Sequence, residues 1–302
     1  MYVYALLYII IMSLISVDAF TDSAFKGNPA AVCLLEEEED SNDEKWMQSI
    51  AAEFNISETC FLTPIPNATS IPRFHLRWFT PVTQVNLCGH ATLAASHSLF
   101  SYASLDSNII EFVTLSGVLT AKKVPASTAS NLHHAQSQDG CYIELDFPVD
   151  PITDFNSADT SQISDALGGA SIIDIKRTQI GGHLLVVVAS GTTVTELQPQ
   201  LDAIVKCPGT GIMVTAIAPP ESGFDFYSRF FCPKCGINED PVTGSAHCAL
   251  ALYWSKKLGK CDFNAYQASP RGGVLKVHLD EQNQRVFLRG KAVTVMEGCL
   301  LV

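Results

Sequence analysis

A small set of acidic, basic and hydroxyl side chains lies beside two glycines in this sequence. The candidates are Cys88, Gly89 and His90 in the first half, and Asp240, Thr243, Gly244 and Ser245 in the second. Carboxylate and imidazole groups can move protons, and a glycine at a helix start leaves backbone N–H groups open to an anion. We therefore expect acid/base chemistry on an anionic substrate, bound at two helix starts.

A further candidate is Glu58, a lone glutamate at the entry to the apolar stretch 59–62. A neutral residue at position 58 would fit the apolar pattern of this stretch equally well. One interpretation is a carboxyl group partly removed from water at a cleft, where it could transfer a proton. The residues alone also allow an edge position or an exposed strand start.

Two segments without formal charge are predicted to be buried helices. The second, residues 245–255, is apolar on every side, which is typical of a buried helix. Lys256 and Lys257 suit its C-terminal end, and Gly259 suits a left-handed cap. The first is predicted over His90 to Leu105. The free N–H groups at these helix starts would favour an anionic ligand.

The surroundings of the two helices repeat. Trp78 and Phe79 precede a proline and then Gly89, and Phe230 and Phe231 precede a proline and then Gly244. The repeat indicates two similar lobes. The predicted class is α+β, with each lobe a curved, mostly antiparallel sheet or barrel wrapped around a buried central helix. The expected domains are 1–124 and 140–302, joined by a linker at 125–139, and the last strand is free to return to the first lobe.

Composition limits the classes of partner. The chain has 302 residues, 47% of them hydrophobic, and a formal net charge of −12. Nucleic-acid binding needs clustered Lys and Arg, so we expect no nucleic-acid partner. Residues 1–17 are apolar and uncharged, and no Lys or Arg precedes Lys26. They indicate an extended first strand, with secretory or anchored targeting as the alternative. We expect a cytoplasmic protein without a membrane partner.

The ten cysteines do not form a disulfide framework in a chain this long. Most stand singly in apolar runs and are expected to be buried thiols. Cys232 and Cys235 form one C-x-x-C pair without a second pair at zinc-site spacing. We expect a turn there and no metal, and a zinc site or a thiol redox site is the alternative.

Five segments taken together resemble the phenazine-biosynthesis PhzF-like family. They are residues 17–21, 27–32, 57–59, 88–92 and 239–246. The resemblance implies the two-lobed diaminopimelate epimerase-like fold, with the site in the cleft between the lobes. It also implies that Glu58 is the acid/base that relays a proton in an isomerisation. His90, Asp240 and Ser245 would be supporting polar groups, and Gly89 and Gly244 would present backbone N–H groups.

Related racemases and epimerases place a cysteine at the start of each central helix. Here the first position is Cys88, but the second is Thr243. A threonine hydroxyl is a far weaker acid than a thiol, so two-thiol racemisation is not expected. A single-thiol epimerase that uses Cys88 stays open as an alternative.

The expected function is therefore that of an isomerase, which moves a proton within a small carboxylate substrate without metal or organic cofactor. Glu58, His90 and Asp240 are the expected catalytic groups. Gly89, Gly244, Ser245, Cys88 and Thr243 are the expected substrate-binding residues. A non-catalytic ligand-binding or interaction module on the same fold is the competing interpretation, and a homodimer is left open.

Overall fold

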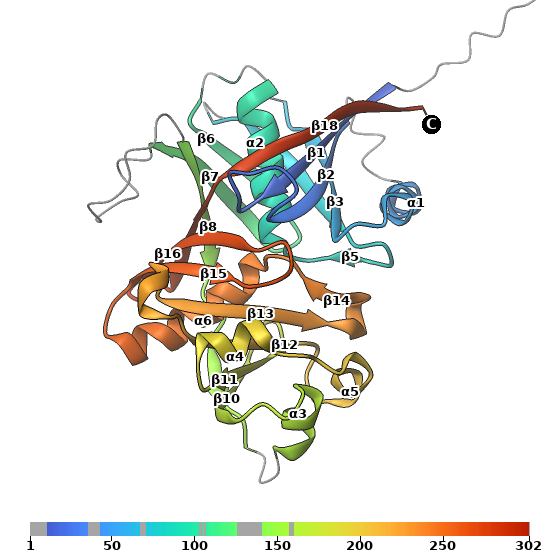
Figure 1. The fold of residues 1–302 in the computed structure, drawn as a ribbon. Helices are drawn as coiled ribbons and strands as arrows, with labels where there is room; N and C mark the ends of the chain where they lie inside the picture. Colours follow the sequence, from blue (N-terminus) through green and yellow to red (C-terminus); the bar gives the residue numbers. More distant parts are fainter. Residues whose placement is uncertain are drawn as a thin grey trace, which may run out of the picture.

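The computed structural model describes residues 11–35, 43–66, 71–102, 105, 107–125, 141–156 and 160–301 (Figure 1). Of the expected linker at 125–139, Pro125 is the last residue of β7 and the rest lies outside the described residues, as do residues 1–10. The first half contains β1 (Ile11–Ala19), β2 (Asn28–Leu34), α1 (Glu44–Phe54), β3 (Glu58–Pro64), β4 (Arg73–Phe79), β5 (Gln84–Val85), α2 (Gly89–Tyr102), β6 (Ile109–Thr114), β7 (Gly117–Pro125) and β8 (Cys141–Pro148).

The second half is built from similar elements. It contains β9 (Ile152–Asp154), α3 (Ser161–Ala166), β10 (Ile172–Thr178), β11 (Leu184–Val188), α4 (Gly191–Glu196), α5 (Leu201–Lys206), β12 (Ile212–Ile217), η3 (Pro220–Ser222), β13 (Phe226–Cys232), η4 (Pro233–Cys235), β14 (Ile237–Asp240), α6 (Gly244–Leu258), β15 (Asp262–Gln267), β16 (Gly273–Asp280), β17 (Arg285–Gly290) and β18 (Ala292–Leu301). Strands predominate around a few helices, so the chain is of the predicted α+β class.

The strand pairings of the two halves follow the same order. In the first half β1–β2 is antiparallel, β2–β3 parallel, β3–β4 and β4–β5 antiparallel, β4–β6 parallel, and β6–β7 and β7–β8 antiparallel. The series from β10 to β17 repeats these relations pair by pair. The repeated topology supports the internal duplication inferred from the aromatic–proline–glycine repeat.

Two pairings join the series. β8 pairs with β17, and β18 pairs with β1, so the last strand lies against the first. Figure 1 shows α2 enclosed by the blue and green strands and β18, and α6 lying among the orange strands. The apolar N-terminal run therefore continues as β1 from Ile11. Among the described residues, no helix has the length and apolar character needed to cross a membrane.

One hydrophobic core surrounds both central helices. It includes Leu93 and Ala94 of α2 and Leu250 and Ala251 of α6. Nearly every residue in the first three turns of each helix is buried, as predicted for helices that are apolar on all sides. Two smaller clusters lie under α1 and under α3–α5.

Both central helices begin at the predicted glycines, Gly89 and Gly244. The predicted C-terminus of the first helix was wrong, because α2 ends at Tyr102, before Leu105. Its uncharged sequence carries no stop signal, whereas α6 ends at the predicted left-handed cap, Gly259.

Two further boundaries differ from what the sequence pattern indicates. Residues 194–206 have a sequence typical of a single helix, but the structure has two helices in this region, α4 and α5. Pro199 lies in the break and has no N–H group to continue a helix. Residues 181–188 have a sequence typical of one buried strand, but β11 begins only at Leu184. The N–H group of Gly181 instead donates to the Asp150 carboxylate (3.0 Å), as do those of the two residues before it.

The C-x-x-C segment is a turn, as expected. Pro233–Cys235 form η4, which is closed by Gly236 in a left-handed conformation. Both thiols are free, with Cys232 buried and Cys235 exposed.

Candidate active site

Glu58 and His90 form a buried pair between a strand start and a helix start. Glu58 is the first residue of β3, which pairs with β2 and β4, and its residue exposure is 8%. His90 is the second residue of α2 and is 2% exposed. Glu58 Oε2 lies 3.1 Å from His90 Nε2, although the two atoms are not aligned as a hydrogen bond. An acid and a base are thus held within proton-transfer distance in a site with little water.

Asn28 connects this pair with the second half of the chain. Its amide nitrogen Nδ2 lies 3.0 Å from His90 Nδ1 and donates to Asp240 Oδ1 at 2.7 Å. It also donates to the carbonyl oxygen of Val242 at 2.9 Å. Asn28 is fully buried and Asp240 is 5% exposed. A single amide therefore joins β2 and α2 to the end of β14.

Thr243 and Gln267 extend the connection. The Thr243 hydroxyl donates to Asp240 Oδ2 at 2.5 Å, and the Gln267 amide donates to Thr243 Oγ1 at 3.1 Å. Gln267 Oε1 accepts from the backbone N–H of Thr243 at 2.8 Å. Because the Thr243 hydroxyl is used in this way, Thr243 makes no side-chain cap bond at the start of α6. The first N–H groups of α6 receive no capping oxygen from it, which suits an incoming anion.

We call this set the polar network. Its members are Glu58, His90, Asn28, Asp240, Thr243 and Gln267. All of them are buried; five come from five different elements in both halves of the chain, and Thr243 is the N-cap of α6. Buried polar groups are costly unless they are paired, so such a network holds its members in a defined arrangement.

Burial and nearby charges shift the titration of two members. Burial raises the pKa of Asp240 to about 6, and the charge of Glu58 acts in the same direction. The charge of His90 and the hydrogen bonds from Thr243 and Asn28 act in the opposite direction but do not cancel it. Asp240 therefore holds its proton more tightly than an ordinary aspartic acid does.

For His90, the neighbouring charges raise the pKa by more than burial lowers it. Burial alone lowers the pKa of this imidazole, but the charge and contact of Glu58 and the charge of Asp240 raise it above its ordinary value. The carboxylates on both sides thus increase the affinity of the ring for a proton.

The two predicted glycines bring the helix starts into contact. A Cβ atom added to Gly89 would lie 2.9 Å from the Cα atom of Gly244, and one added to Gly244 would lie 3.1 Å from the Cα atom of Gly89. The sequence-based reason for these glycines was access for a ligand. The structure gives a second reason for glycine at these positions. A side chain at either one would collide with the backbone of the other helix.

Cys88 lies within the site but is poorly suited to act as a base. Its Sγ atom is 3.5 Å from His90 Nδ1. Burial, followed by the charge of Glu58, raises the pKa of this thiol well above its ordinary value. The thiolate is the reactive form, so the single-thiol alternative is disfavoured. One ligand atom each from Glu58, Cys88 and His90 lie within 4.8 Å of one another, so these side chains could hold a metal ion only if the thiol gave up its proton.

Ser245 is the second residue of α6 and is partly exposed. It adjoins the contact between the glycines. The structure therefore brings every predicted site residue to the two helix starts or the strand ends beside them.

Two members of the polar network were missed by sequence reasoning. Neither Asn28 nor Gln267 was among the predicted site residues. A polar residue next to Pro29, immediately before the apolar run 30–35, was an available signal for Asn28. No comparable signal marks Gln267, which ends an ordinary strand.

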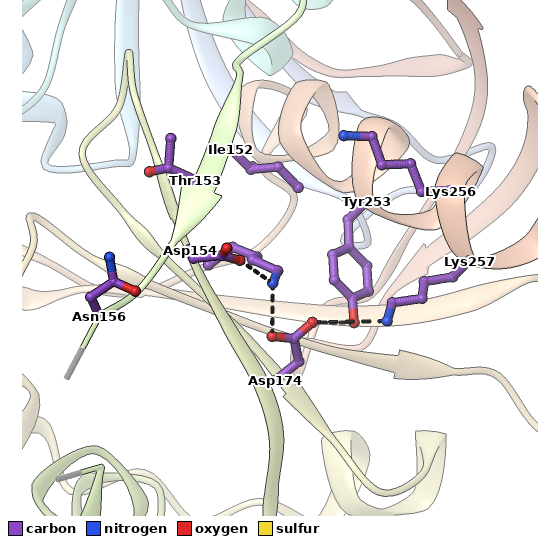
Figure 2. A pocket seen from close by; sticks show the side chains of 9 residues that line it. Ile152, Thr153, Asp154, Asn156, Asp174, Tyr253, Lys256 and Lys257 are labelled. Carbon is purple, nitrogen blue, oxygen red and sulfur yellow. Dashed lines mark hydrogen bonds and ion pairs between the residues drawn. The ribbon is translucent and has the colours of Figure 1, made fainter. Parts of the chain in front are cut away.

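A large groove lies elsewhere, between β9, β10 and the C-terminal end of α6 (Figure 2). Its volume is about 690 Å³. Lys176 pairs with Asp154 at 2.6 Å and with Asp174 at 3.1 Å, and Asp174 also accepts from the Tyr253 hydroxyl. These charges are neutralised within the groove, and none of the predicted site residues lines it. The candidate site is therefore the polar network.

Comparison with known proteins shows the family of the chain. The sequence model of the family described as phenazine biosynthesis-like protein (PhzC-PhzF) matches residues 17–298. The chain belongs to this family. The match covers both central helices and every member of the polar network.

Relatives are similar over nearly their whole length. A protein of Halalkalibacterium halodurans named as an uncharacterized isomerase is 44% identical over 290 residues, with 95% of this chain and 97% of the relative covered. A crystal structure of a PhzF-family phenazine biosynthesis protein from Enterococcus faecalis has a TM-score of 0.78 and 36% identity, covering 97% of this chain and 100% of the other.

A more distant structure shares the fold alone. It is a hydroxyproline epimerase from Agrobacterium vitis with bound trans-4-hydroxy-L-proline. Its TM-score is 0.58 at 12% identity, with coverage of 97% of this chain and 93% of the other. The names of two relatives, printed as uncharacterized isomerases, support an isomerase-type function.

Proposed function

We propose that this chain is an isomerase that moves a proton within a small carboxylate substrate, with Glu58 as the acid/base. The observation that carries the proposal is the buried contact between Glu58 Oε2 and His90 Nε2, at the junction of the two helix starts. The name of the H. halodurans relative supports the reaction class.

The helix starts supply the substrate site in this proposal. The first N–H groups of α2 and α6 carry partial positive charge and lie side by side at Gly89 and Gly244. They would bind the substrate carboxylate although the chain as a whole carries a formal charge of −12. Ser245, partly exposed at the same helix start, would add a hydroxyl group.

Glu58 would then perform the chemistry. It takes a proton from a carbon activated by adjacent unsaturation and returns it to another carbon of the same molecule. His90 stabilises the charge that develops, because its ring lies against Glu58. Low exposure of both groups keeps water from competing for the proton.

Asp240 has a supporting role in this proposal. Its Oδ1 accepts from Asn28 and its Oδ2 from Thr243, so both carboxyl oxygens are occupied within the polar network. We therefore propose that Asp240 holds the two halves of the site in a fixed position relative to each other. Cys88, with its raised pKa, packs behind His90.

An exchange experiment in D₂O tests the proposal. The protein is incubated with a panel of small unsaturated cyclic carboxylates and α-amino carboxylates, and proton NMR follows the loss of C–H signals. Thermal shift identifies the members that bind. We expect at least one bound member to take up solvent deuterium. Binding without exchange for every ligand would overturn the proposal in favour of a non-catalytic binding module.

A further inference from the structure

The side-chain amide of Asn28 lies at the centre of the polar network. It is fully buried, and its Nδ2 atom lies within 3.0 Å of three polar atoms from different parts of the chain. Two of them, Asp240 Oδ1 and the Val242 carbonyl oxygen, accept hydrogen bonds from Nδ2, whereas the role of His90 Nδ1 depends on the tautomer of its ring. The Oδ1 atom of Asn28 has no hydrogen-bond partner among the described residues.

The acceptors determine which way the amide faces. The Val242 carbonyl oxygen can only accept, and it lies 2.9 Å from Nδ2. Asp240 Oδ1 lies 2.7 Å from the same atom. Turning the amide over would place Oδ1 against both oxygens, with repulsion at each contact. The nitrogen of Asn28 must therefore face His90.

This orientation of the Asn28 amide determines which nitrogen of the His90 ring carries the proton. His90 Nδ1 lies 3.0 Å from an NH₂ group, which has no lone pair to accept a hydrogen bond. A proton on Nδ1 would face the hydrogens of the amide. Nδ1 must carry the lone pair instead, and the ring proton is then on Nε2, the nitrogen that lies 3.1 Å from Glu58 Oε2.

We infer that Asn28 is a positioning residue that fixes the Nε2–H tautomer of His90 and so keeps the ring proton on the nitrogen beside Glu58. Asn28 also ties this tautomer to Asp240, since the same NH₂ group donates to both. The role rests on the proposed function, in which Glu58 and His90 act on the substrate together.

The Asn28 amide opposes the effect of the neighbouring charges on the protonation of His90. Glu58 on β3 and Asp240 on β14 both face His90 and favour its doubly protonated form, and the Cys88 thiol lies beside Nδ1. The Asn28 NH₂ group disfavours that form, because the second proton would have to sit on Nδ1. Removing the amide should therefore make His90 easier to charge.

Nitrogen-15 NMR of protein labelled at histidine tests the inference without a substrate. Long-range ¹⁵N–¹H correlation spectra are recorded from pH 5 to 9, and His90→Gln identifies the ring. We expect neutral His90 in the wild type to carry its proton on Nε2. In Asn28→Ala we expect a mixture of tautomers and proton affinity about tenfold higher, one pH unit in the titration midpoint.

The exposed Asn283→Ala substitution is the matched control and should leave the His90 spectrum as in the wild type. An Nδ1–H tautomer in the wild type would overturn the inference, even if Asn28→Ala fails to fold. The same tautomer and midpoint in Asn28→Ala would also overturn it. Loss of deuterium exchange is not the readout here, so the proposed function and the role of Asn28 can fail separately.

Discussion

At the scale of single residues, the site depends on polar groups that are buried and paired. Glu58, His90 and Asp240 were expected to act together, and the structure places them in one network through Asn28. Asn28 was missed because its partners His90 and Asp240 are 62 and 212 positions away. Such contacts depend on how the halves dock, which local patterns do not report.

His247 gives a prediction that concerns stability against pH. It is fully buried on α6, its Nδ1–H donates to the Thr243 carbonyl oxygen at 2.8 Å, and its Nε2 has no partner among the described residues. Burial lowers its pKa to about 4, although the contact with Thr243 raises it in part. An unfolded histidine titrates near pH 6.5. Between about pH 6.5 and 4 the unfolded state thus binds more protons, so stability falls as the pH falls.

His247→Phe removes this titration. From pH 7 to pH 4.5 we expect the wild type to lose up to about 3 kcal/mol more unfolding free energy than the variant. Urea unfolding at both pH values measures the difference. His183, whose pKa is lowered to about 4 chiefly by burial, is present in both proteins and provides a common background. Equal losses in the two proteins would contradict the assignment.

At the scale of elements, the decisive feature is the contact between the starts of α2 and α6. Ala normally stabilises a helix relative to Gly, by up to about 1 kcal/mol. At Gly89 the added Cβ would lie 2.9 Å from the backbone of Gly244. We expect Gly89→Ala to destabilise the protein by about 1–3 kcal/mol, as overpacking does.

The control for this prediction is Gly298→Ala. Gly298 is exposed on β18, and an added Cβ would meet nothing within 4 Å. Its urea unfolding midpoint should stay close to that of the wild type. A Gly89→Ala protein as stable as Gly298→Ala would show that the helix starts do not pack as closely as described.

The sequence predicted the elements better than their ends. Uncharged segments gave both central helices and their first residues, because glycine and burial mark those positions directly. Pro199 and the Asp150 loop explain two of the wrong boundaries, since each changes where backbone N–H groups can bond. Gln267 could not be predicted, because its polar partners belong to β14 and the start of α6.

At the scale of the whole molecule, two copies of one strand order meet at their central helices. The halves are joined by β8–β17, by β1–β18 and by the polar network. Because the two helix starts meet at Gly89 and Gly244, we expect a ligand at one of them also to contact the other. The duplication would then produce one shared site, with different residues contributed by each half.

Amide hydrogen exchange tests whether the starts of α2 and α6 form one anion site. A bound carboxylate from the thermal-shift panel should slow amide exchange at residues 89–92 and 244–247 together, because both helix starts would contact it. Lys256 and Lys257, beside the groove of Figure 2, should exchange as in the free protein. Protection at only one helix start would contradict a shared anion site.

The most direct test of the central claim is Glu58→Gln, which keeps the side-chain volume and removes the exchangeable carboxyl proton. With a carboxylate that undergoes exchange in the wild type, solvent deuterium incorporation should fall about 10²-fold or more, the usual contribution of a positioned acid/base. Affinity for the carboxylate should change little. The exposed Glu221→Gln is the matched control. Wild-type exchange in Glu58→Gln, with exchange lost in Cys88→Ala, would contradict the account and restore the single-thiol alternative.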